Sequence, residues 1–110
     1  MKYPGGNMST HPLLNKEEIR KIISEIEHTL VKLEREYREN YSGSFKIIHL
    51  RGKPYIYRCF KKNGKWKTKY IGKGDEKKLE QLKKHQHEVR MKIEKYRKIV
   101  KLLRELYETL

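Results

Sequence analysis

Cysteine is almost absent from this chain, which has one, Cys59. A single cysteine cannot form a disulfide within the chain, so a disulfide-stabilised secreted fold is excluded. The sequence also lacks an apolar run as long as a signal-peptide core or a membrane-spanning helix. We therefore expect a cytoplasmic protein that folds by packing its helices and strands.

Apolar residues are also scarce, at 35% of the chain against 38% charged residues. This balance leaves little surface for a thick core, so an elongated or oligomeric domain is favoured over a compact globule. The regular spacing of Ile, Leu and Tyr is typical of a folded chain. The abundance of Lys, Glu, Ile and Tyr is typical of a thermophilic archaeal or viral protein.

Acidic residues are missing altogether from residues 43–74, although the segment is strongly basic. The two flanking segments mix both signs of charge, so the net charge of +14 is concentrated in the middle of the chain. Lysines that only solubilise a surface are usually mixed with acids, and a block of one sign indicates a polyanionic partner. The ten basic residues are Lys46, Arg51, Lys53, Arg58, Lys61, Lys62, Lys65, Lys67, Lys69 and Lys73.

Residues 1–14 contain Pro4, Gly5, Gly6 and Pro12 and no periodic pattern. We expect a flexible leader here, followed by one domain over residues 15–110. Met8 is a second candidate for the start of translation.

Two heptad-patterned helices are predicted, at about 15–41 and about 75–110. Asn15 and Glu18 form a capping box, Leu14 and Ile19 are placed as a hydrophobic staple, and Asp75 is the expected cap of the second helix. The helices are expected to pair antiparallel as a coiled-coil hairpin in which the longer second helix overhangs. Gln86, the polar member of its seam, is either a register-setting residue or the point where the first helix ends.

The C-terminal end of the second helix is more apolar than one seam requires. We expect a homodimer formed through this overhang, in which a second helix covers the additional side chains. The residues assigned to this interface are Ile99, Leu102, Leu103, Leu106, Tyr107 and Leu110.

Three strands are predicted between the helices, at about 44–50, 54–62 and 65–71. Asn63-Gly64 predicts a type I′ turn, which fixes Lys62 opposite Lys65 and Tyr57 opposite Tyr70. One face then gathers Tyr55, Tyr57, Cys59, Trp66, Thr68 and Tyr70, and the other gathers Arg58, Lys62, Lys65, Lys67 and Lys69 with Ile56, Phe60 and Ile71. We expect the aromatic face to pack on the helices and the cationic face to remain free. The predicted class is therefore α+β, with two helices flanking a three-stranded antiparallel sheet.

The free cationic face predicts a nucleic-acid interface, since Lys and Arg on a sheet neutralise phosphates when the sheet lies in the major groove. An alternative for Trp66 and the tyrosines is stacking on unpaired bases. The residues assigned to nucleic-acid binding are Arg51, Lys53, Arg58, Lys62, Lys65, Lys67, Lys69 and Lys73.

No catalytic constellation, metal site or cofactor site is predicted. His85 and His87 fall on different sides of a helix, and Cys59 and His49 lack zinc-ligand spacing. Gly72-Lys73-Gly74 precedes a helix but lacks a phosphate-loop pattern.

Four short motifs carry a resemblance: Gly43-Ser44-Phe45, Gly52-Lys53-Pro54-Tyr55-Ile56-Tyr57, Asn63-Gly64-Lys65 and Tyr70-Ile71-Gly72. Over residues 43–85 this pattern resembles the three-stranded, arm-type DNA-binding domain of tyrosine-recombinase integrases. It is also similar to small archaeal proteins of plasmids and viruses that place such a hairpin between helices. The chain lacks the integrase catalytic domain, so the resemblance implies DNA binding without recombination.

We therefore expect a protein that binds duplex DNA in a regulatory or architectural role, with no enzymatic activity and no small-molecule substrate. One alternative is an RNA-binding protein, in which the sheet follows an A-form backbone. Another is a coiled-coil adaptor whose lysines serve only solubility.

Overall fold

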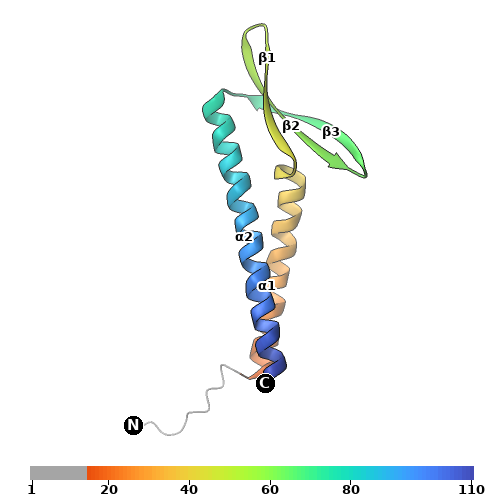
Figure 1. The fold of residues 1–110 in the computed structure, drawn as a ribbon, viewed down its shortest axis with the longest axis vertical. Coiled ribbons are helices and arrows are strands. Elements are labelled where there is room, and N and C mark those ends of the chain that lie inside the picture. Colours follow the sequence, from red (N-terminus) through yellow and green to blue (C-terminus); the bar gives the residue numbers. More distant parts are fainter. Residues whose placement is uncertain (1–14) are drawn as a thin grey trace, which may run out of the picture. The chain divides into compact units, whose positions relative to one another are not determined.

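The computed structural model describes residues 15–110, so the expectations for the leader, for Met8 and for the Leu14 staple lie outside the described residues. The elements follow in the order α1 (Lys16–Glu36), a π-helical turn η3 (Tyr37–Tyr41), β1 (Ser44–Leu50), β2 (Lys53–Lys62), β3 (Lys65–Lys73) and α2 (Glu76–Thr109) (Figure 1). The predicted α+β class, with two helices and one three-stranded antiparallel sheet, is confirmed. Within this described range, neither helix is long and apolar enough to cross a membrane.

The described residues divide into two compact units. A helical unit contains residues 15–32 and 93–110, and a sheet unit contains residues 33–92. Both helices contribute to both units, and the sheet belongs wholly to the second.

Both helices begin at the predicted caps. The side-chain oxygen Oδ1 of Asn15 accepts a hydrogen bond from the backbone N–H of Glu18 at 2.8 Å. Asp75 Oδ1 accepts from the N–H groups of Lys77 and Lys78 at 3.1 and 3.2 Å. These bonds satisfy amide groups that the first helical turn leaves without partners, which explains why the starts were readable from sequence.

In the helical unit, α1 and α2 lie side by side and antiparallel (Figure 1). Ile19 and Ile23 of α1 pack with Val100 of α2, and Leu103 and Tyr107 join this cluster. The prediction that Leu103 and Tyr107 belong to an overhang is wrong, because the start of α1 already covers them. Three other apolar side chains of this end remain exposed: Leu102, Leu106 and Leu110.

The first helix ends in a widened turn. The N–H of Ser42 donates to the carbonyl of Tyr37 at 2.8 Å, five residues back, which is the π-helical pattern. Gly43 follows with φ of 86°, and a Cβ at this position would lie 2.0 Å from the carbonyl oxygen of Cys59. The sequence predicted that the first helix ends at about residue 41 but not that its last turn is wide.

The strands pair in the order β1-β2-β3. Asn63 and Gly64 have φ of 53° and 77°, as a type I′ turn requires, and the predicted pairs of β2 with β3 are confirmed. Arg51 and Gly52 form a second two-residue turn with φ of 55° and 75°. This turn fixes a register that the sequence left open, with Phe45 opposite Arg58 and Ile47 opposite Ile56.

One face of the sheet packs on the first part of α2. Ile56, at 0% exposure, and Phe45, at 4%, form a core with Leu79, and Tyr41, Ile47, Ile71 and Leu82 surround it. Gln86 of α2 donates from Nε2 to the carbonyls of Tyr41 and Gly43 at 2.6 and 2.9 Å. Gln86 therefore bonds to the point where the first helix ends, which was the second of its two predicted roles.

Candidate nucleic-acid interface

The sheet buries the opposite face from the one we predicted. Ile56 and Arg58, which were assigned to the free cationic face, are the two most buried large side chains, at 0% and 2% exposure. Trp66 and Tyr70, which were assigned to the core, are 70% and 51% exposed. The reason lies in β1, because its register adds Phe45 and Ile47 to the side that carries Ile56. That side thereby becomes the more apolar one near the helix.

Arg58 is buried because backbone oxygens at the end of α1 accept its N–H groups. Nη1 donates to the carbonyl and hydroxyl oxygens of Ser42 at 2.8 and 3.1 Å, and Nη2 donates to the carbonyl of Glu39 at 2.6 Å. The ring of Phe60 lies 4.1 Å from its guanidinium carbon. Burial lowers the pKa of Arg58, since it penalises the charged form. Arg58 thus holds η3 against the sheet, and the prediction that its side chain lies on a free face is wrong.

The other face, here called the aromatic–basic face, carries side chains of all three strands on one side of the sheet. Cross-strand partners share a face, and the pairs Lys46–Tyr57, Ile48–Tyr55 and Lys61–Trp66 define it. Its members are Ser44, Lys46, Ile48, Leu50, Lys53, Tyr55, Tyr57, Cys59, Lys61, Trp66, Thr68, Tyr70 and Lys73. No acidic residue belongs to this face, because residues 43–74 contain none.

Three tyrosines form a ring cluster in the middle of this face. The ring centroid of Tyr70 lies 6.3 Å from that of Tyr55 and 5.4 Å from that of Tyr57, both tilted. Toward the Asn63-Gly64 turn, the Nζ of Lys61 lies 5.4 Å from the centroid of the Trp66 ring. The face therefore presents cations beside the exposed rings of Trp66 and Tyr70.

Apolar side chains extend the same face along β1. Ile48 and Leu50 are 42% and 52% exposed, next to the turn formed by Arg51 and Gly52. A contiguous exposed surface of apolar, aromatic and cationic groups is typical of a binding site. Arg51 has positive φ, which is uncommon for a residue other than glycine.

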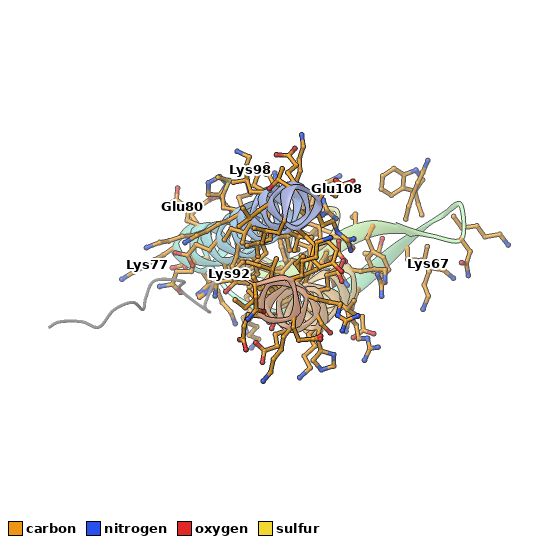
Figure 2. The ribbon with its side chains drawn as sticks, turned by 90° about the horizontal axis from the view of Figure 1, so that it is seen from below. Lys67, Lys77, Glu80, Lys92, Lys98 and Glu108 are labelled. Carbon is orange, nitrogen blue, oxygen red and sulfur yellow. The ribbon has the colours of Figure 1, made fainter. Side chains whose placement is uncertain are left out.

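The eight predicted site residues are divided among different surfaces. Lys53 and Lys73 lie on the aromatic–basic face, Arg51 is in the turn beside it, and Arg58 is buried. The remaining four lie on the reverse face of the β2–β3 hairpin and are exposed: Lys62, Lys65, Lys67 and Lys69. Lys67 projects from this hairpin (Figure 2).

Sequence reasoning did not assign Lys46 and Lys61 to the site, although both lie on the exposed aromatic–basic face. The alternation of side chains along β2 could have identified Lys61, since it has the same parity as Tyr55 and Tyr57. Lys46 required the β1–β2 register, which the sequence did not provide.

Over residues 15–110, no group of three or more His, Cys, Asp or Glu side chains is placed to hold a metal ion. The thiol of Cys59 lies 3.9 Å from the hydroxyl of Thr68.

Comparisons with family models, with curated proteins and with solved structures find no match to the chain. The resemblance to integrase arm domains stays a prediction.

Proposed function

We propose that the protein binds nucleic acid, duplex DNA in the first place, through the aromatic–basic face of its sheet. The observation that supports this most is the exposure of Trp66, at 70%, and Tyr70 on a face that carries four lysines and no acid. Exposed aromatic groups are costly in water, and a surface that combines them with unopposed cations matches a polyanion with flat apolar bases.

Duplex DNA fits a three-stranded sheet better than duplex RNA does. The major groove of B-form DNA is wide enough to admit strands, whereas that of A-form RNA is too narrow for side chains to reach the bases. The lysines at the margins supply phosphate contacts, and Ile48 and Leu50 are suited to the methyl groups of thymine. The proposed role is regulatory or architectural.

Single-stranded nucleic acid is the second candidate. Stacking of an unpaired base on an aromatic side chain contributes about 1–3 kcal/mol, and Trp66 is exposed enough to act as such a platform. This candidate predicts that Trp66 contributes more to the free energy of binding than any lysine does. When the sheet lies in the major groove of a duplex, by contrast, the free energy of binding is distributed over the whole face.

Binding of one labelled sequence as duplex DNA, duplex RNA and single strand, measured by fluorescence anisotropy at several salt concentrations, tests the proposal. We expect Lys46→Gln and Lys61→Gln each to lower the slope of log affinity against log salt by about one, because each removes one phosphate contact. For duplex DNA, Trp66→Ala should weaken binding by no more than one of these lysine variants does, and it should leave the melting temperature nearly unchanged.

Lys92→Gln is the matched control, since Lys92 is an exposed lysine of α2 outside the face. Equal losses for Lys92→Gln and Lys46→Gln would contradict the assigned face. Tighter binding to the single strand than to duplex DNA, with the largest loss for Trp66→Ala, would select the second candidate. Absence of binding to all three at physiological salt would favour a protein adaptor.

A further inference from the structure

A second basic surface lies beyond the first residue of β1, on the reverse side of the β2–β3 hairpin. The pairing of β1 with β2 ends at Ser44 and Cys59, but β2 continues to Lys62. Residues 60–62 therefore pair with β3 alone and leave one edge of β2 open. A groove lies beside this edge, and Lys61 and Asn63 contribute to its lining at the turn. Its other lining residues are Arg38, Glu39, Arg58, Phe60, Lys62 and Lys69.

The charges in this reverse groove are unbalanced. Arg38, Lys62 and Lys69 are exposed cations, and Arg58 adds a buried one. Glu39 is the acidic residue among the side chains that line the groove. The groove thus has an excess of positive charge in a concave, partly apolar surface, where the field of each charge is less screened than on open surface.

Arg58 has no carboxylate among its hydrogen-bond partners, although only 2% of its surface is exposed. Carbonyl and hydroxyl oxygens accept its Nη groups, and its Nε finds no partner among the described residues. A buried charge that no opposite charge compensates is costly, and an anion bound nearby lowers that cost.

We propose that the reverse groove binds a backbone phosphate of a nucleic-acid strand that passes the open edge of β2. The inference rests on the proposed function, and it specifies that the reverse groove contacts the phosphate oxygens of the nucleic acid. When a sheet lies in the major groove, the two phosphate backbones run along its edges, so an edge that carries cations meets phosphates. Arg38 and Lys69 contact the phosphate, and the positive charge of the buried Arg58 stabilises the bound anion without touching it.

The test uses the full chain and the same duplex titrations over a range of salt. Arg38→Gln and Lys69→Gln are each expected to weaken binding about three- to tenfold and to lower the salt slope by about one. Glu39→Gln is expected to strengthen binding about two- to threefold, because it removes the one carboxylate that opposes the phosphate. The backbone carbonyl of Glu39 that accepts from Arg58 is retained in this variant.

Lys92→Gln again serves as the matched control, and circular dichroism melts verify that each variant is folded. Unchanged affinity and slope for Arg38→Gln and Lys69→Gln, while Lys46→Gln still weakens binding, would overturn the groove and leave the proposed function intact. If the wild type binds single strands but no duplex, the same variants are titrated with the single strand. Affinities of Arg38→Gln and Lys69→Gln equal to that of the wild type would then overturn the proposed phosphate site. If the wild type binds neither, both proposals fail.

Discussion

Arg58 illustrates how one side chain can change the interpretation of a whole surface. An arginine in a block of basic residues is expected at a polyanion, yet this one is 2% exposed and donates to carbonyl oxygens at the end of the first helix. Arginine can do this because its planar guanidinium donates in several directions and binds oxygen acceptors that carry no charge. These hydrogen bonds join β2 to the end of the first helix.

Replacing Arg58 with methionine should therefore reduce stability before it affects binding. The carbonyls of Glu39 and Ser42 lose a donor, and we expect the free energy of unfolding to fall by about 2–4 kcal/mol. Denaturation by urea at neutral pH measures the change. Arg90→Met, which alters an exposed arginine of α2 in the same unit, is the control and should change stability by less than about 0.5 kcal/mol. An unchanged stability with lost DNA binding would restore Arg58 to the interface.

At the scale of elements, local signals predicted the helices and strands well. The signals at Asn15, Asp75 and Asn63-Gly64 are local, because they act through hydrogen bonds to nearby residues or through backbone angles of the turn itself. A short stretch of sequence is therefore enough to predict their effect. The choice of the buried face could not be read in this way. It depends on Phe45 and Ile47, whose position opposite β2 follows from a turn at Arg51-Gly52 that lacks the usual Asn-Gly signal.

The junction of α2 with the end of α1 depends on Gln86. Its amide donates to the carbonyls of Tyr41 and Gly43, so replacement by leucine leaves both without this donor. We expect Gln86→Leu to lower the free energy of unfolding by about 1–3 kcal/mol, even though leucine suits the apolar seam. Chemical denaturation checks this, with Gln81→Leu on the exposed side of α2 as the control. A more stable Gln86→Leu variant would mean that seam packing outweighs the two bonds.

For the whole molecule, the remaining apolar surface of the helical unit concerns assembly. Leu102, Leu106 and Leu110 stay 63%, 37% and 50% exposed, while Leu103 and Tyr107 are occupied by contacts with α1. We expect a second copy of the chain to cover these side chains, which gives a homodimer at about 100 μM by sedimentation. Leu102→Glu should yield the monomer, whereas Met91→Glu, which changes another exposed apolar residue of α2, should not. A monomeric wild type would contradict this.

The bonds that Arg58 of β2 and Gln86 of α2 make to the end of α1 have a practical consequence for handling the protein. Arg58 and Gln86 both donate to neutral carbonyls, and neither bond is an attraction between two opposite ions. Dissolved salt weakens contacts between lysines and phosphates much more than it weakens such partly buried bonds to neutral oxygens. If the protein binds DNA as proposed, a column of immobilised DNA should accordingly release it in concentrated salt with its tertiary structure intact, and the protein should bind again once the salt is diluted.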